Sequence, residues 1–354
     1  MPHLFDSLTI RGITLRNRIG VSPMCMYSYK DGFSNDWQVS HLGARAVGGA
    51  GLIIAEATAV EPRGRITPYD VGIWSKEHIQ PLARVAQTIK QNGAVAGIQI
   101  AHAGRKASTK RPWDGGTPTL PDQPGGWQTI APSPIAFSPA SDIPKEMSME
   151  DIHSVQAAFR NATSRALEAG FEFLEIHAAH GYLLHSFLSP ISNQRTDDYG
   201  GNFENRIRFL LETTRQVRST WPDQLPLAVR ISGSDWVPGG WTVDESVELA
   251  RHLKLEGVDV IDCSSAGTSP MATVPVGPGY QVPISEAVRH GADILTAAVG
   301  LITAPEQADE IIRNDRADIV LLGREFLRDP YWPLHAAQIL NHPAPTPPQY
   351  LRGF

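Results

Sequence analysis

Residues 226–265 read "PLAVRISGSDWVPGGWTVDESVELARHLKLEGVDVIDCSS" and contain one complete strand–helix–strand unit. Two short apolar runs, 226–233 and 258–265, enclose an amphipathic stretch at 243–256. Thr242 is followed within three residues by two acids, which is a helix start signal. A nearly continuous apolar run followed by a helix is typical of a parallel strand buried on both faces.

The same unit recurs along the whole chain. The expected strands cover 18–24, 51–60, 94–102, 171–179, 226–233, 258–265, 293–300 and 317–323. Helical patterns between them cover 77–92, 149–169, 203–220, 243–256, 281–290, 305–314 and 331–341. Eight units predict a closed (β/α)8 barrel, a TIM barrel, as one domain over 1–354. An open doubly wound sheet would need a Gly-rich turn after an early strand, whereas the glycines of 43–51 precede one.

The connection after the third expected strand, residues 103–148, is unusually long and rich in Pro, Gly, Ser and Trp. Loops of this length are functional or disordered more often than they are simple connections. A loop after a barrel strand lies at the carboxyl ends of the strands, where it can cap an active site. A capping loop is therefore expected, and a surface insertion without a role is the alternative.

Composition narrows the class of protein. The chain has 354 residues, 42% apolar and 19% charged, with a formal charge of -6. A negative net charge and the lack of a basic tract argue against nucleic-acid binding. No apolar run approaches the ~18 residues of a membrane span, and the first residues do not resemble a signal peptide. Two distant cysteines, Cys25 and Cys263, favour a reducing compartment. We expect a soluble cytoplasmic protein.

The fourth expected strand ends in "EIHAAHGY", residues 175–182. His177 and His180 can bind a metal, with His185 available as a third ligand, although Glu175 is expected to face away from them and no other acid ends a strand nearby. They can also be hydrogen-bonded core residues. In the third interpretation they are neutral donors that converge on a carbonyl or anionic oxygen, with Tyr182 as a positioned acid.

Other strand ends suggest an anion site. Gly300 and Gly323 end the seventh and eighth expected strands, where barrels commonly bind phosphate, and Arg324 can add a charged contact. Arg230, at the end of the fifth strand, is costly in a barrel mouth unless it faces an anion such as a reduced flavin, or pairs with a nearby acid. Gln99 can donate to and accept from the pyrimidine edge of a flavin.

These residues lie in longer motifs that together resemble one family. The motifs are "RNRIGVSPMCMYS" (16–28), "GIQIAHAGRKA" (97–107), "EIHAAHGYLLHSFLSPISNQRTDDYGG" (175–201), "VDVIDCSS" (258–265), "PGYQVP" (278–283), "AVGLIT" (298–303) and "LLGREFLRDP" (321–330). Over essentially its whole length the chain resembles the Old Yellow Enzyme family of FMN-dependent ene-reductases, in particular its bacterial thermophilic-like branch.

The resemblance implies a role for each motif residue. The implied FMN contacts are Ser22, Pro23, Met24, Cys25, Ala57, Gln99, Arg230, Ser265, Gly300, Gly323 and Arg324. Cys25 is implied to tune the flavin potential, although a free cysteine is most often a small buried apolar residue. His177 and His180 are implied to bind the substrate carbonyl, Tyr27 to add a hydroxyl and Tyr182 to supply a proton. Lys106 is implied to lie near the site.

The implied reaction has two halves and no metal. NADPH, or NADH, reduces tightly bound FMN, which then transfers hydride to the β-carbon of an activated alkene: an α,β-unsaturated ketone or aldehyde, a maleimide or a nitroalkene. The tail 343–354 ends in "QYLRGF", from which the resemblance implies that Arg352 reaches a neighbouring active site in a homodimer or dimer-based tetramer. Relatives often end in Trp where this chain has Phe354.

Two rival functions remain open on sequence grounds. A metal- or phosphate-dependent barrel lyase or hydrolase would use the histidines as ligands. A non-catalytic flavin- or ligand-binding protein would not need the set of His177, His180 and Tyr182. The physiological alkene, the choice between NADPH and NADH, the stereoselectivity and the effect of the extended 108–128 segment are not readable from the sequence.

Overall fold

The computed structural model describes residues 2–344 and 346–353, and its centre is a closed barrel of eight parallel strands. The strands, in chain order, are β3 (Ile19–Val21), β4 (Leu52–Ala59), β5 (Val95–Ala101), β8 (Phe173–Ala178), β9 (Leu227–Ser232), β10 (Val260–Ser264), β11 (Leu295–Ala298) and β12 (Ile319–Leu322). Each pairs with the next along the chain, and β12 closes the ring against β3. The predicted (β/α)8 barrel is therefore confirmed.

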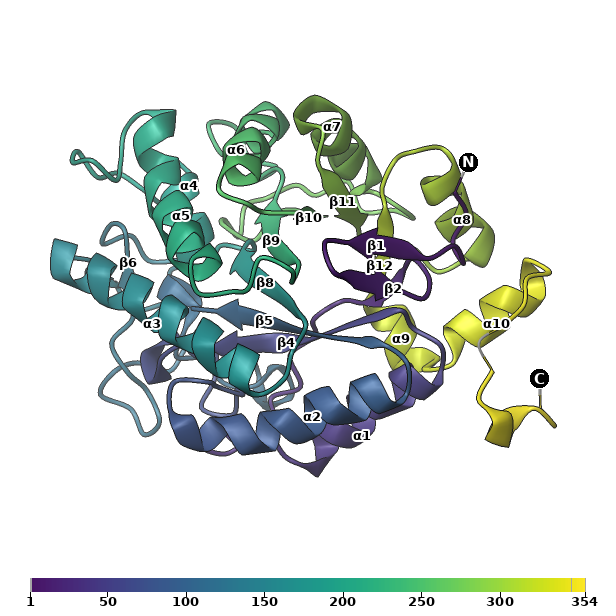
Figure 1. Cartoon of the computed structure of the whole chain (residues 1–354). Coiled ribbons are helices and arrows are strands. Elements are labelled where there is room, and N and C mark those ends of the chain that lie inside the picture. The colour runs from purple at the N-terminus through teal and green to yellow at the C-terminus, as the bar shows by residue number, and fades with distance from the viewer. Residues whose placement is uncertain (1, 345, 354) are drawn as a thin grey trace.

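Helices surround the barrel on all sides (Figure 1). They are α1 (Asp36–Val47), α2 (Ile79–Gln91), α3 (Met149–Glu168), α4 (Leu183–Leu188), α5 (Phe203–Arg218), α6 (Val243–Leu255), α7 (Val282–Ala292), α8 (Pro305–Arg313), α9 (Arg324–Arg328) and α10 (Trp332–Ile339). Ser148 and Thr242 each form a reciprocal capping box, and the one at Thr242 confirms the start signal in the sequence.

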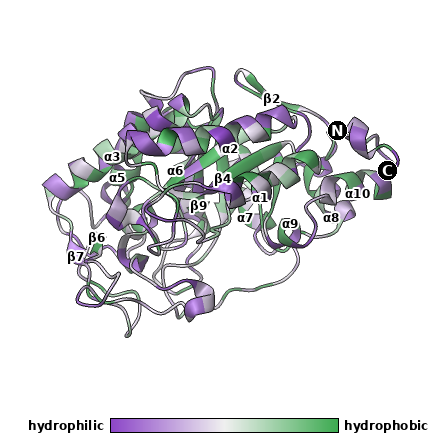
Figure 2. Ribbon diagram, turned by 90° about the horizontal axis from the view of Figure 1, so that it is seen from below, coloured by the Kyte–Doolittle hydropathy of each residue, from purple (hydrophilic) through white to green (hydrophobic). Residues whose placement is uncertain are grey.

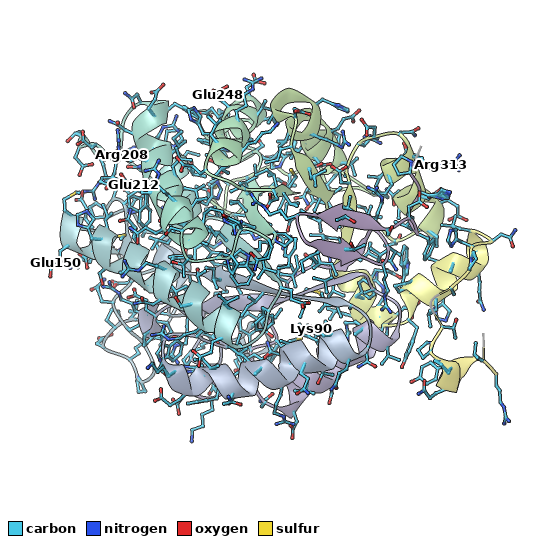
Figure 3. The ribbon with its side chains drawn as sticks, in the orientation of Figure 1. Lys90, Glu150, Arg208, Glu212, Glu248 and Arg313 are labelled. Carbon is cyan, nitrogen blue, oxygen red and sulfur yellow. The ribbon has the colours of Figure 1, made fainter. Side chains whose placement is uncertain are left out.

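Apolar side chains fill the barrel and the layer between strands and helices. Figure 2 colours strand β4 mostly hydrophobic, and all eight of its residues are buried. Charged side chains such as Glu150, Glu248 and Arg313 lie on the outer side of the helices (Figure 3). Within the described residues, no helix is long and apolar enough to cross a bilayer.

A short hairpin of β1 (Leu8–Ile10) and β2 (Ile13–Leu15) covers one end of the barrel (Figure 1). Ile10 and Leu15 pack with residues from the beginnings of the strands, among them Leu52 and Val260. The hairpin thus closes the amino-terminal end of the barrel, which leaves the opposite end for a site.

The loop 103–148 folds over that opposite end. It contains two paired two-residue strands, β6 (Ile130–Ala131) and β7 (Lys145–Glu146). Ala103 and Ala107 form a small apolar cluster with Ile66, against which Trp127 and Tyr182 pack. The loop therefore contacts the mouth of the barrel, as a capping loop would.

Several elements were not predicted. Helix α1 was missed because its buried side includes Gln38 and Arg45, so its apolar period is weak. Helices α4 and α9 are too short for a periodic signal. The first barrel strand is shorter than its predicted range, 18–24, because the chain leaves the sheet after Val21.

Candidate active site

The ends of β8, β9 and β10 meet in one cluster of polar side chains. His177 pairs in register with Arg230, and Arg230 with Asp262. On the other side of β8, Gln99 pairs with Glu175. Residues as many as 76 positions apart in the chain are therefore direct neighbours in adjacent strands.

His177 is buried and oriented by its own turn. Its Nδ1 accepts a hydrogen bond from the Ala179 N–H at 3.2 Å, so the proton of the neutral ring lies on Nε2. Burial, followed by the charge of Arg230, lowers the pKa of His177 well below its usual value. The ring is thus a neutral donor at neutral pH.

His180 has a left-handed backbone conformation, with φ of 60°, that non-glycine residues rarely adopt. Its N–H donates to Ser232 Oγ at 2.8 Å, and its carbonyl accepts from Lys106 Nζ at 2.8 Å. Its Nε2 lies 2.7 Å from Ser264 Oγ. Strain of this kind persists where neighbours hold the residue on every side, which is typical of functional sites.

Glycines make this turn possible. A Cβ on Gly181 would lie 2.2 Å from the Gly267 carbonyl oxygen, and one on Gly267 would lie 2.5 Å from the His180 backbone. Both glycines also have positive φ. The turn after β8 and the segment after β10 therefore cross at van der Waals contact, and this crossing sets the position of His180.

The two imidazoles and Tyr182 form one edge-to-face cluster. The ring centroids of His177 lie 5.1 Å from those of His180 and of Tyr182, with interplanar angles of 88° and 86°. Burial raises the pKa of Tyr182 above its usual value. Its hydroxyl therefore stays protonated at neutral pH and can donate.

Glu175 lies on the same inner face as His177, so the expectation that it faces away was wrong. Residues i and i+2 of a strand share a face. Glu175 accepts from Gln99 Nε2 at 2.8 Å, deep in the barrel. Burial, together with the carboxylate of Asp262, raises its pKa well above the usual value. Within the described part of the chain, no three His, Cys, Asp or Glu residues are grouped as metal ligands.

Arg230 is buried and contacts both an acid and the first strand. Its Nε lies 3.2 Å from Asp262 Oδ2, and its Nη1 donates to Ser22 Oγ at 3.1 Å. The alternative interpretation of Arg230, an ion pair with a neighbouring acid, is thus present in the fold. The same guanidinium also lines a pocket, so the two interpretations are compatible.

That pocket, at the ends of β11 and β12, has a volume of about 160 Å³. Its polar and glycine lining includes Arg230, Ser264, Tyr280, Gln281, Gly300, Gly323, Arg324 and Arg328. Gly300 has φ of 131°, and a Cβ there would lie 3.0 Å from Gln281 Nε2. A cradle of glycines and arginines fits a phosphate group.

Three of the remaining predicted residues, Pro23, Met24 and Ser265, lie near the pocket at the ends of β11 and β12. Met24 lies beside Gly323, since a Cβ on Gly323 would be 3.6 Å from the Met24 sulfur. Pro23 lies between Ser22 and Met24 in the chain, and is half-buried. Ser265 lies behind the pocket wall, where its Oγ donates at 2.7 Å to Oε1 of Gln281, a residue that lines the pocket.

On the mouth side, Cys25 and Tyr27 pack against the same apolar cluster as Tyr182. Ala57 and Tyr182 both line a small adjoining cavity. Cys25 is half-buried, and burial raises the pKa of its thiol. This thiol is therefore neutral at neutral pH.

One predicted site residue lies elsewhere. Arg352 is exposed on the C-terminal tail, which extends away from the barrel (Figure 1). Phe354 lies outside the described residues.

The sequence analysis missed three residues of the site, Gln281, Tyr280 and Asp262. The first two lie in the quoted "PGYQVP" motif, in a loop at the carboxyl ends of the strands, which is the signal that could have found them.

Comparison with known proteins identifies the family. Residues 3–342 match the model of the NADH:flavin oxidoreductase / NADH oxidase family. The chain belongs to this family. It is thus a flavin-dependent enzyme, and the resemblance to Old Yellow Enzymes read from the motifs was correct.

The sequence similarity to known relatives extends over nearly the full length of the chain. An NADPH dehydrogenase of Geobacillus sp. (strain WCH70) is 51% identical over 353 residues, covering 99% of this chain and 98% of the relative. One of Bacillus subtilis (strain 168) is 48% identical over 353 residues, covering 99% of each. The solved structure of morphinone reductase has 25% identity and a TM-score of 0.81, covering 97% of this chain and 91% of that one. The enzyme therefore uses FMN, with NADPH or NADH as the reductant.

Proposed function

We propose that this family member is an ene-reductase for activated alkenes: α,β-unsaturated ketones and aldehydes, maleimides and nitroalkenes. The observation that carries the proposal is the pair of buried, neutral imidazoles of His177 and His180 beside the protonated Tyr182. Neutral donors aimed at one oxygen stabilise the negative charge that develops on a carbonyl when its alkene accepts hydride.

The proposal gives each ring a defined proton. His177 donates from Nε2, because its Nδ1 accepts from Ala179. For His180 the proposal requires the tautomer with the proton on Nδ1, in which Nε2, 2.7 Å from Ser264 Oγ, is the acceptor. Tyr182 then supplies a proton to the α-carbon, and Tyr27 adds a hydroxyl at the mouth. A positioned acid of this kind contributes about 10²- to 10⁴-fold to the rate.

The residues that would hold FMN lie in or just after seven of the eight barrel strands, at the carboxyl ends, in this proposal. They are Ser22, Pro23, Met24, Cys25, Ala57, Gln99, Arg230, Ser265, Gly300, Gly323 and Arg324. The arginine and glycine cradle fits the phosphate, and the buried Arg230 guanidinium suits the electron-rich edge of the ring system. When bound, FMN accepts hydride from the nicotinamide and passes it to the alkene. In this assignment, 1–354 is one FMN-binding domain.

Arg230→Ala is expected to yield protein that binds little FMN, because the anion site loses a buried positive charge. The ratio of flavin to protein absorbance measures the occupancy. Arg230→Lys, which keeps the charge, is the matched control and should retain more flavin. Full FMN occupancy in a folded Arg230→Ala protein would contradict the assignment.

The direct test of the function is an anaerobic visible spectrum. NADPH should bleach the flavin band, and 2-cyclohexenone should restore it. Bleaching without recovery for any enone, maleimide or nitroalkene would overturn the ene-reductase assignment while leaving the family intact.

We also propose a homodimer, or a tetramer built from such dimers, in which Arg352 reaches the neighbouring active site. In support, Arg352 is exposed and the adjacent Leu351 is 62% exposed, as expected of a tail that packs on another subunit. The free cysteines Cys25 and Cys263 suit a cytoplasmic location.

Arg352→Ala is expected to raise the KM for the alkene by about ten-fold, the effect of losing a charged hydrogen bond. Steady-state kinetics measure this change, and light scattering measures the assembly. Arg160→Ala, an exposed arginine on α3, is the control. A monomeric mass for the wild-type protein would contradict the proposal.

A further inference from the structure

A further cavity lies beneath the capping loop, with a volume of about 280 Å³. Its lining includes Arg105, Lys106, Thr129, Phe137, Asp142 and Tyr182. We call it the capping-loop cavity. Tyr182, the proposed acid, forms part of its wall, so the cavity adjoins the place where an alkene would react.

The capping-loop cavity holds two cations that have no directly paired acid. Arg105, which is buried, and Lys106, which is half-buried, form no ion pair within residues 2–344 and 346–353, and Asp235 acts on Arg105 only from beyond ion-pair distance. The acid in the lining, Asp142, accepts a hydrogen bond from Gln128 at 3.1 Å instead. Burial lowers the pKa of Lys106 to about 8 and that of Arg105 to about 10. Buried cations are costly unless an anion compensates them.

Backbone carbonyls satisfy only part of the donor capacity of these cations. Arg105 donates from Nη1 to the Ile135 carbonyl at 3.1 Å and from Nη2 to the Thr268 carbonyl at 2.6 Å. Its buried Nε has no partner. Lys106 donates to the carbonyls of His180 and Gly267, which leaves its third N–H free.

Thr129 adds a second orphaned donor. Its hydroxyl is buried without a hydrogen-bond partner, and the residue is 5% exposed. Its carbonyl accepts from the Lys145 N–H at 2.9 Å, directly before strand β6, so the backbone holds it firmly. A buried hydroxyl left unpaired costs free energy, and a ligand oxygen in the cavity would recover it.

An aromatic surface joins the cations to the reacting centre. Lys106 Nζ lies 4.5 Å from the ring centroid of Phe137 and 5.3 Å from that of Tyr182. A planar or apolar linker can pack on these rings while its charged end faces the cations. The lining thus combines aromatic rings with hydrogen-bond donors and positive charge.

We propose that the capping-loop cavity binds a carboxylate carried on the tail of the alkene substrate, whose carbonyl end lies at His177 and His180. The inference rests on the proposed function and names the substrate class: activated alkenes with an anionic tail. Arg105, Lys106 and Thr129 donate to the carboxylate. A hydrogen bond to a charged group is worth a factor of about ten or more in affinity.

The test compares two ligands that differ only in charge. Reduced holoenzyme is mixed with 3-carboxycinnamaldehyde or its methyl ester, and kcat/KM is measured for each. In a separate binding titration, 3-hydroxybenzoate and its methyl ester shift the flavin band of oxidised holoenzyme. The binding titration needs no turnover, so it tests the cavity even if neither aldehyde is reduced.

Three variants isolate the hydroxyl of Thr129. Thr129→Val removes it at nearly constant volume, and Thr129→Ser keeps it. Thr214→Val is the matched control, since Thr214 is also a buried threonine with an unpartnered hydroxyl but lies on α5, outside the lining of the cavity. Melting temperatures of all three confirm folding.

We expect wild-type enzyme to prefer each carboxylate over its ester by about ten-fold or more. Thr129→Val should reduce this preference several-fold, while Thr129→Ser and Thr214→Val keep it. Absence of a preference in wild type, or an equal preference in Thr129→Val, would overturn the proposal. So would a Thr129→Val effect confined to flavin reduction by NADPH, which would assign the cavity to the dinucleotide phosphates.

Discussion

Replacing Tyr182 by phenylalanine is expected to slow alkene reduction by about 10²- to 10⁴-fold, the contribution of a positioned general acid. Phenylalanine keeps the ring, and with it the edge contact to His177 and the contact to the Lys106 ammonium. Only the hydroxyl is lost. Because the nicotinamide half-reaction needs no proton from Tyr182, reduction of the flavin by NADPH should change little.

Stopped-flow absorbance separates the two half-reactions at the flavin band. The matched control is Tyr69→Phe, which removes the hydroxyl of a tyrosine that is 41% exposed and is not part of the proposed site. If both half-reactions of Tyr182→Phe slowed equally, the residue would have a structural role, and the proton donor would have to be sought elsewhere.

Replacing His177 by alanine is expected to cost about 10²- to 10³-fold in alkene reduction, the typical effect of losing one donor from an oxyanion site. It should also weaken the binding of phenols, whose oxygen the same donors would hold. The change removes the Nε2 donor and leaves the buried Ala179 N–H without its partner. Steady-state kinetics and the phenol-induced shift of the flavin band measure both effects.

His177→Asn is the matched variant for this prediction. An asparagine amide can accept from the Ala179 N–H and still donate, so part of the activity should return. An ordinary histidine has a pKa of about 6.5. The pKa of His177 is well below that value, so the ring takes up a proton only at lower pH. Phenol affinity should therefore have no histidine titration near that pH. Phenol binding to His177→Ala as tight as to the wild-type enzyme would rule out the donor role.

Much of the fold and half of the candidate site were readable from local patterns. All eight strands lie within their predicted ranges, because fully buried parallel strands leave short apolar runs between helices. Side chains at strand ends, such as His177 and Gly300, could be picked out because a barrel directs that end of every strand to one face.

Other parts of the site depend on contacts that no local pattern contains. The pairing of Arg230 with Asp262, and of Gln99 with Glu175, follows from the register between neighbouring strands. The position of His180 depends on Gly267, more than 80 residues later, whose carbonyl also binds Lys106. Weakly periodic or short helices, such as α1 and α4, acquire their stability from packing instead of from propensity.

The sequence by itself thus determined the barrel, the order of its strands and the residue types at its mouth. The barrel and the strand order follow from the periodicity of apolar residues along the chain. The residues at the mouth follow from the parallel direction of the strands, which all end at the same face. Only the tertiary structure decided which polar groups meet, which stay neutral and which lack a partner. Those properties depend on burial and on distances between residues remote in the chain. The capping-loop cavity illustrates this, since the resemblance implied only that Lys106 lies near the site, and the fold alone shows that Lys106 and the buried Arg105 line one cavity without a directly paired acid.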